Sequence, residues 1–258
     1  LGIKDILCIV QEDDLTIFKK IFGTGSDVGI NFSYEIQKIQ KGIVDAYFIA
    51  EKFLNGSPSV LALSDNVFLG KSYFNSANSA LQKMYEKGGS VFGLQVPDPE
   101  KFGVIELDNN KNILDIEEKP SKPKSNLIIP GFYFFDSEAS KFAKMLKPSN
   151  RGELEITDLI KIYHSEKKLN LEVLDKSIVW YDTGNANALL EAAQKVKLYE
   201  QNNNVKIGSY EIASYEQGFI GKSDLNEIAE KYINSDYGKY NSENNDTIFS
   251  KNVIVTYL

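Results

Sequence analysis

The first two thirds of the sequence alternate short apolar runs with longer segments of helical periodicity. Ile6–Val10, Val60–Leu63 and Ser90–Gln95 have the length and the composition of buried strands. Residues 43–54 and 73–86 carry apolar side chains at helical spacing. Such alternation predicts an α/β fold in which helices cover both faces of a doubly wound sheet, and such sheets bind ligands beyond the carboxyl ends of their strands.

The pattern changes in the middle of the chain. Val104–Leu107 and Ile113–Glu117 flank a turn rich in Asp and Asn, which predicts a hairpin. Pro130-Gly131 interrupts the apolar run Leu127–Phe135 and indicates either a sheet edge or a bend close to a ligand. We expect a long helix over Ala186–Asn202 and small helices after it.

Rare residues exclude several kinds of chemistry. The 258-residue chain has one cysteine, Cys8, and one histidine, His164, which excludes an intrachain disulfide and argues strongly against a His/Cys zinc cluster or a Ser-His-Asp triad. Its net charge of −7 argues against a surface for polymeric nucleic acid. No apolar run approaches the roughly 18 residues of a membrane helix. We therefore expect a soluble cytoplasmic protein that uses carboxylates, lysine, arginine and a hard metal ion.

Two aspartates stand at the ends of predicted strands. Asp65 follows the apolar run Val60–Leu63, and Asp182 follows residues 178–181 and precedes Thr183-Gly184. Carboxylates at the carboxyl edge of a sheet suit Mg²⁺, which shares its oxygen ligands with phosphates. Each aspartate alone is also explained as a cap of a turn or helix, whereas the two together favour a metal site.

Two further segments carry cations. A bend at Pro120 would place the Glu118 carboxylate and the Lys119 ammonium on one rim, and a solvated loop is the alternative. Arg151 is the only arginine in a lysine-rich chain. Because a planar guanidinium can bind phosphate through two parallel hydrogen bonds, we interpret Arg151 as an anion-binding residue.

These segments, in this order, resemble the bacterial glucose-1-phosphate thymidylyltransferases, members of the sugar-nucleotide nucleotidyltransferase superfamily. The resemblance runs from Leu1 to about Tyr240. It rests on Leu61–Gly70, Phe102-Gly103-Val104, Glu117–Pro120, Arg151–Asp158, Trp180–Gly184, Gly218-Phe219-Ile220 and Asp236–Tyr240.

The resemblance implies that the phosphate of glucose 1-phosphate attacks the α-phosphorus of dTTP, giving dTDP-glucose and pyrophosphate with Mg²⁺ as the cofactor. It also implies a homotetramer that supplies activated sugar for deoxysugar and surface-polysaccharide synthesis. The implied fold is a Rossmann-like, GT-A-like mixed sheet flanked by helices, with a small C-terminal helical extension.

The resemblance also assigns roles to residues. Lys119 and Arg151 would be catalytic and bind the sugar phosphate, with Trp180 beside it. The other implied contacts are Asp65 and Asp182 to Mg²⁺, Gln37 and Gly42 to thymine, and Asn66, Gly103, Glu118 and Ile129 to glucose.

The implied domains are a nucleotidyltransferase core over residues 1–203, a helical extension over 204–240 and a tail over 241–258. The family's first strand, its glycine-rich loop and a downstream lysine, which together hold the triphosphate, would precede Leu1. We therefore expect the 258-residue chain by itself to have little or no activity.

Three positions depart from the family pattern: Ser64 replaces a glycine, Asp45 an amide residue and Pro130 a hydroxyl residue. They favour one alternative, a non-catalytic paralogue that binds sugar nucleotide. A second alternative is a sister nucleotidyltransferase that uses UTP, CTP, GTP or another sugar 1-phosphate. A glycosyltransferase is a weaker interpretation of Asp65, because the triplet Ser64-Asp65-Asn66 has no second acid.

Overall fold

The structure, a computed structural model, describes residues 1–234, with side chains up to residue 230. These residues form two compact units, which are described separately: residues 37–192, and residues 2–36 together with 193–234. The expected boundary between residues 203 and 204 stays a prediction. The matching segment Asp236–Tyr240 and the expected tail 241–258 lie outside the described residues.

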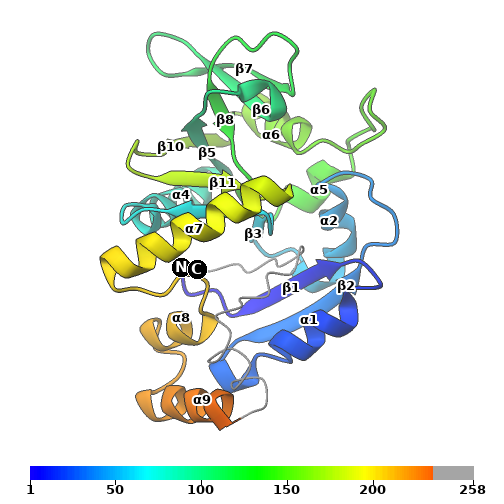
Figure 1. Cartoon of the computed structure of the whole chain (residues 1–258). Coiled ribbons are helices and arrows are strands. Elements are labelled where there is room, and N and C mark those ends of the chain that lie inside the picture. The colour runs from blue at the N-terminus through cyan, green and yellow to red at the C-terminus, as the bar shows by residue number, and fades with distance from the viewer. Residues whose placement is uncertain (235–258) are drawn as a thin grey trace. The chain divides into compact units, whose positions relative to one another are not determined.

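A seven-stranded mixed sheet organises the first unit (Figure 1). Its order is β3 (Ser59–Ala62), β9 (Phe132–Phe135), β5 (Gly89–Gln95), β8 (Leu127–Ile129), β6 (Gly103–Leu107) and β7 (Ile113–Glu118), with β10 (Leu169–Val173) also paired to β5. The β10–β5 pair is parallel and the other pairs are antiparallel. The sheet is therefore mixed rather than uniformly doubly wound, because short turns join several of its strands.

The bend at Pro130-Gly131 divides the expected strand Leu127–Phe135 in two. β8 pairs with β5 and β6, whereas β9 pairs with β3 and β5. Because of this bend, the two halves of one apolar run form two different strands of the sheet. It confirms the predicted interruption of the strand at this point.

Helices pack on this sheet and contribute side chains to the hydrophobic core of the unit. They are α2 (Asp45–Ile49), α3 (Glu51–Leu54), α4 (Tyr73–Lys87), η2 (Pro99–Lys101), α5 (Ala139–Ala143) and α6 (Ile156–Ser165). α4 lies against β5 and β10, and α6 lies against β7 and β10. The expected helix over 43–54 is two short helices, α2 and α3, that meet at Ala50.

A separate two-stranded sheet lies within the same unit. β4 (Asn66–Leu69) pairs antiparallel with β11 (Val179–Asp182), and Asn66 stands opposite Asp182. The sequence analysis missed β4, because its apolar residues directly follow a polar turn and number only three. This pairing brings the two predicted metal-binding segments together.

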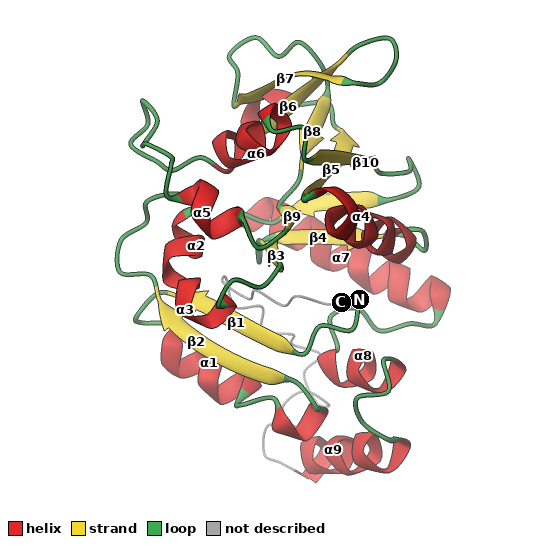
Figure 2. Cartoon of the chain, turned by 180° about the vertical axis from the view of Figure 1, so that it is seen from behind, coloured by secondary structure: helices red, strands yellow, loops and turns green. Residues whose placement is uncertain are grey.

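The second unit joins early and late parts of the chain. Figure 2 shows the parallel strands β1 (Asp5–Val10) and β2 (Asn31–Ile36) side by side, with α1 (Leu15–Phe22) along them. The other elements are η1 (Ser26–Val28), α8 (Tyr210–Glu216) and α9 (Lys222–Asn234), and α7 (Ala186–Asn203) leads from one unit to the other.

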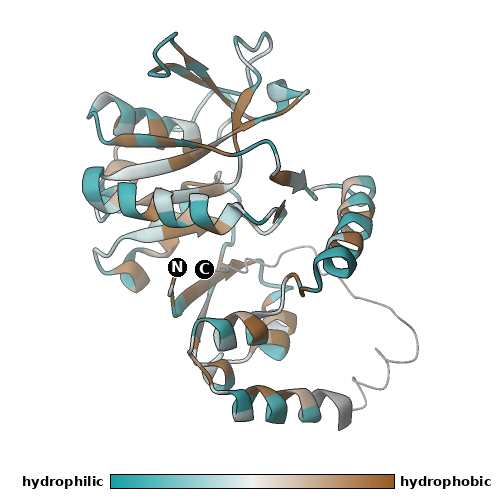
Figure 3. Ribbon diagram, turned by 90° about the vertical axis from the view of Figure 1, so that its left-hand side faces the viewer, coloured by the Kyte–Doolittle hydropathy of each residue, from teal (hydrophilic) through white to brown (hydrophobic). Residues whose placement is uncertain are grey.

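The core of the second unit contains Cys8 and Phe18 from its early part and Ile228 from α9. The alternation of brown and teal along α9 in Figure 3 reflects its amphipathic sequence. Early and late segments therefore share one hydrophobic core. Within residues 1–234, no helix combines the length and apolar character needed to cross a membrane.

We predict that Tyr163→Phe destabilises the protein. The Tyr163 ring is fully buried, and its hydroxyl donates to Asp136 Oδ1 at 2.7 Å. Loss of this hydrogen bond to a carboxylate should lower the free energy of unfolding by about 1–3 kcal/mol, measured by urea denaturation. Tyr85→Phe is the control, because Tyr85 is 69% exposed and should show no measurable change. Equal stability of the two variants would contradict the prediction.

Candidate functional site

The two predicted metal-binding aspartates face one small space. The backbone N–H of Thr183 donates to the carbonyl oxygen of Asp65 at 2.7 Å, so the turn after β3 is fixed to the end of β11. A methyl group on Gly184 would lie 3.0 Å from Asp182 Oδ1 and 3.9 Å from Asp65 Oδ2. Glycine therefore keeps open the space that both carboxylates border.

The electrostatics of this space favour a cation. Burial raises the pKa of Asp65 above its ordinary value; the hydrogen bond from Asn66 lowers it, and the nearby charge of Asp182 raises it further. Among the described residues, no group of three or more His, Cys, Asp or Glu side chains could hold a metal. Two carboxylates nevertheless fit Mg²⁺, which commonly takes one or two protein carboxylates and completes its shell with water and substrate phosphates.

Asn66 connects this pair to the rest of the site. Its Oδ1 accepts from the backbone N–H of Gly131 at 2.9 Å and from Trp180 Nε1 at 2.7 Å. Its Nδ2 donates to Asp65 Oδ1 at 2.7 Å. Because Trp180 and Gly131 can only donate to it, they fix the orientation of the amide and direct its N–H₂ group to the Asp65 carboxylate. Asn66 and Trp180 thus lie beside the carboxylate pair.

Glu118 and Lys119 share one rim, as the sequence predicts. The bend, however, is at Lys119 itself, whose φ of 43° lies in the left-handed region. The backbone N–H of Lys119 donates to the carbonyl oxygen of Phe102 at 3.0 Å. Lys119 Nζ lies 3.9 Å from Glu118 Oε1, so adjacent residues that an extended strand would direct to opposite faces point the same way.

Arg151 joins this rim within a group of carboxylates. Its Nη1 lies 3.6 Å from Glu118 Oε1 and 3.5 Å from Glu155 Oε1, and its Nη2 lies 3.2 Å from Glu153 Oε1. Glu155 is buried and accepts a hydrogen bond from the Ser149 hydroxyl at 2.8 Å. The carboxylates hold the guanidinium beside Glu118.

Gly103 and Ile129 lie beneath this rim. Gly103 pairs with Glu118 on one side and with Ile129 on the other. A methyl group on Gly103 would lie 2.6 Å from Thr157 Cγ2 and 3.6 Å from Glu118 Oε2, so the close approach of α6 requires glycine here. Ile129 is buried beside it.

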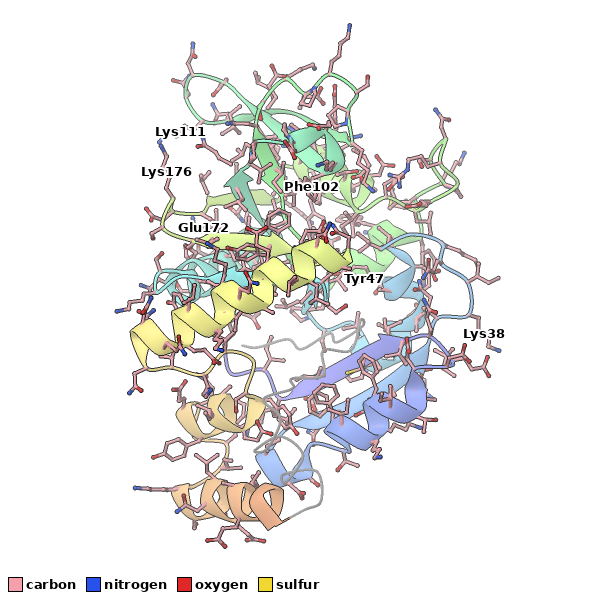
Figure 4. All side chains as sticks on the ribbon, viewed as in Figure 1. Lys38, Tyr47, Phe102, Lys111, Glu172 and Lys176 are labelled. Atoms are coloured by element: carbon pink, nitrogen blue, oxygen red, sulfur yellow. The ribbon has the colours of Figure 1, made fainter. Side chains whose placement is uncertain are left out.

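Three aromatic residues lie between the carboxylate pair and the rim that bears Lys119 and Arg151. The ring of Phe102, labelled in Figure 4, meets Trp180 edge to face with centroids 5.2 Å apart. The hydroxyl of Tyr133 is buried, and its pKa is raised by burial and further by the charges of Glu118 and Asp65. The predicted metal, sugar and phosphate residues therefore belong to one region of the unit.

Gly42 connects to this region through Leu154, whereas the printed partner of Gln37 is Asp45, to whose Oδ2 its Nε2 donates at 3.0 Å. The backbone N–H of Leu154 donates to the carbonyl oxygen of Lys41 at 2.7 Å. Gly42 has a φ of 102°, and a methyl group there would lie 2.4 Å from the carbonyl oxygen of Leu154. The loop therefore needs glycine at this position and lies against the segment that carries Arg151.

Sequence reasoning missed several residues of this site. Glu155 and Gly184 hold or border the predicted side chains, although neither was given a role, and Gly131 was predicted only as part of a bend. A signal existed for Glu155, a lone charge between the apolar residues Leu154 and Ile156, four positions after the only arginine. The contacts of Gly131 and Gly184 depend on chain segments that are distant in the sequence.

We predict that Glu118→Gln stabilises the protein at neutral pH. Burial and then the charge of Glu155 raise the pKa of Glu118 above its ordinary value of 4.5, although Lys119 and Arg151 act in the opposite direction. The ionised form therefore costs stability above the folded-state pKa, and the cost disappears as the pH falls below the ordinary value.

Urea unfolding should show that Glu118→Gln has a higher free energy of unfolding than wild type near pH 7. This difference should disappear at about pH 4. Glu117→Gln is the matched control, because Glu117 is more exposed and lies 3.4 Å from Lys124. A variant that is less stable near neutral pH would mean that the two cations outweigh the burial of Glu118.

Comparison with known proteins shows which family this chain belongs to. The sequence profile of the nucleotidyl transferase family matches residues 1–198. Glucose-1-phosphate thymidylyltransferase from Neisseria gonorrhoeae is 40% identical over 239 residues, covering 93% of this chain and 82% of that protein. The protein of the same name from Xanthomonas campestris pv. campestris (strain B100) is 39% identical, covering 93% and 80%.

Solved structures agree with this match. A crystal structure from Bacillus anthracis, with a provisional assignment as a glucose-1-phosphate thymidylyltransferase and with bound sucrose, has a TM-score of 0.66 and 30% identity, covering 81% of this chain and 80% of that one. A UDP-glucose pyrophosphorylase with UDP-glucose has a TM-score of 0.64 at 22% identity, covering 78% and 82%, and shows likeness of fold alone. The family expected from the motifs is confirmed: the chain belongs to the nucleotidyl transferase family.

Proposed function

We propose that this protein transfers a thymidylyl group from dTTP to glucose 1-phosphate, with release of pyrophosphate. The observation that carries the proposal is the connection of a carboxylate pair, Asp65 and Asp182, to a rim that bears Lys119 and Arg151. Trp180, which bonds to Asn66 beside the pair, packs against Phe102, whose carbonyl oxygen accepts from the Lys119 backbone N–H. The relatives that match 93% of the chain carry the name of this activity. A site for two polyanions needs both features: carboxylates for a metal ion and cations for phosphate.

In this proposal, Lys119 and Arg151 bind the phosphate of glucose 1-phosphate and orient one of its oxygens toward the α-phosphorus of dTTP. The new P–O bond forms as the bond from the α-phosphorus to the bridging oxygen breaks, and pyrophosphate leaves with that electron pair. Asp65 and Asp182 would hold Mg²⁺, which neutralises phosphate charge when bound. No side chain needs to act as a nucleophile.

Other residues position the substrates in this proposal. Glu118, Asn66, Gly103 and Ile129 would line the glucose site, with Trp180 beside the phosphate, and Gln37 and Gly42 would contact the base. Glu118 accepts from sugar hydroxyls, and its raised pKa reflects the burial that such a role requires. We further propose a cytoplasmic homotetramer that serves deoxysugar and polysaccharide synthesis, with residues 204–240 as an extension of the core.

The activity test uses the protein that the complete reading frame encodes. Pyrophosphate release should require both dTTP and glucose 1-phosphate, and ³¹P NMR should identify dTDP-glucose. Lys119→Ala should lower kcat/KM for glucose 1-phosphate by at least about tenfold, because a charged contact to phosphate is lost. Lys122→Ala, an exposed lysine of the same loop, is the control. Binding of dTDP-glucose without pyrophosphate release would instead identify a non-catalytic binding protein.

The metal site has a test that does not depend on turnover. Trp180 is the only tryptophan. Its indole N–H donates a hydrogen bond to Asn66, and Asn66 donates a hydrogen bond to Asp65. Paramagnetic Mn²⁺ should therefore quench its fluorescence. Asp182→Asn should weaken Mn²⁺ binding by at least about tenfold through loss of a charged ligand. Asp175→Asn, in the exposed loop before β11, should leave the titration unchanged; equal weakening in both variants would refute the assignment.

A further inference from the structure

Arg151 is surrounded by carboxylates at the place where it is expected to bind phosphate. Its Nη2 donates a hydrogen bond to Glu153 Oε1 at 3.2 Å, and its Nη1 lies 3.5 Å from Glu155 Oε1 and 3.6 Å from Glu118 Oε1. Together with Lys119, these side chains are two cations and three carboxylates. A phosphate that approaches Arg151 therefore meets net negative charge unless one carboxylate moves away.

The three carboxylates differ in how easily they can move. The exposed fraction of the side chain is 7% for Glu155, 18% for Glu118 and 42% for Glu153. The backbone of Glu153 is fixed, because its carbonyl oxygen accepts from the N–H of Ser149 at 2.8 Å. Its side chain can still turn into water, and an exposed ion pair contributes little to stability. Glu153 is thus the carboxylate that leaves Arg151 most readily.

Glu155 is held in place from two sides. Its Oε1 accepts from the Ser149 hydroxyl at 2.8 Å, and the oxygen of the same hydroxyl accepts from the backbone N–H of Arg151 at 3.1 Å. One serine therefore links the Glu155 carboxylate to the backbone that carries the guanidinium. Because a buried carboxylate that loses its cation is strongly unfavourable, we expect the contact between Glu155 and Nη1 to persist when a ligand binds.

The charges around Glu118 support the same division. Burial raises the pKa of Glu118, the charge of Glu155 raises it further, and the charge of Arg151 lowers it. Glu118 and Glu155 therefore repel each other, and Nη1 lies within 4 Å of both. This repulsion would be unscreened if the whole guanidinium followed a phosphate. Since a guanidinium has N–H groups on several edges, Nη1 can stay while Nη2 binds a new anion.

We propose that Glu155 is a positioning residue that holds Nη1 of Arg151, and that Glu153 occupies Nη2 until the phosphate of the sugar substrate displaces it. The inference rests on the proposed function, in which Arg151 binds that phosphate. Glu153 is then a competitor built into the site. It keeps the guanidinium oriented in the free protein, and it weakens the binding of the sugar phosphate.

The test uses the protein that the complete reading frame encodes. Calorimetry gives the dissociation constant of glucose 1-phosphate, and pyrophosphate release gives kcat and KM. Glu153→Gln should bind glucose 1-phosphate about two- to fivefold more tightly with unchanged kcat, because a weak competitor is lost. Glu155→Gln keeps an oxygen that accepts from Ser149 but loses the charge, so kcat/KM for glucose 1-phosphate should fall at least about tenfold.

The control is Glu166→Gln, an exposed glutamate at the opposite end of α6 from Glu155, and it should match wild type. KM for dTTP should be unchanged in all three variants, whereas a merely structural role of Glu155 would affect both substrates. In an Arg151→Ala background, neither Glu153→Gln nor Glu155→Gln should have a further effect, because both act through the guanidinium.

Ser149→Ala provides a second measurement if Glu155→Gln fails to fold. It removes the hydrogen bond that holds the Glu155 carboxylate and should weaken glucose 1-phosphate binding a few-fold.

Several results would overturn the inference and leave the proposed function intact. They are unchanged or weaker binding in Glu153→Gln, wild-type kcat/KM in Glu155→Gln, parallel losses for both substrates in Glu155→Gln, unchanged binding in Ser149→Ala, and effects that persist without Arg151. Failure of wild type to bind glucose 1-phosphate would overturn the proposed function as well.

Discussion

The antiparallel pairing of β4 with β11 is the constraint on which the site depends. It joins segments 114 residues apart, places Asn66 opposite Asp182 and gives Trp180 its hydrogen bond to Asn66. Without this pairing, Asp65 and Asp182 would be two unrelated turn residues. With it, their carboxylates border the same space beside Gly184, and a single amide links one of them to the Gly131 bend.

The clustered charges of the site lower the stability of the protein when no ligand is bound. Burial and neighbouring carboxylates raise the pKa values of both Asp65 and Glu118, so their ionised forms are less favourable here than in water. Arg151 offsets part of this cost for Glu118, since it lies within 4 Å of three carboxylates. Such unfavourable electrostatics are common where a cation or a phosphate is to be bound. In the proposed function, the carboxylate pair and the cationic rim would be complementary parts of one site for polyanions.

Local patterns predicted much of this molecule, and long-range contacts account for the rest. The apolar runs of β1, β3 and β5 and the periodicity of α4 predict those elements, because burial and helix spacing act within a few residues. The strand β4 was not predicted, because its extended structure depends on pairing with β11. The motifs predicted the candidate residues Asp65, Lys119 and Arg151 but could not predict the bend at Lys119, whose positive φ depends on a contact with Phe102.

The shared core of the second unit has a consequence for synthesis on the ribosome. Ile6, Cys8 and Phe18 are made more than 200 residues before Ile228 of the same core. The early strand β1 must therefore wait, with part of its apolar surface uncovered, until α9 has been translated. The core of this unit can therefore be completed only after Ile228 has been synthesised.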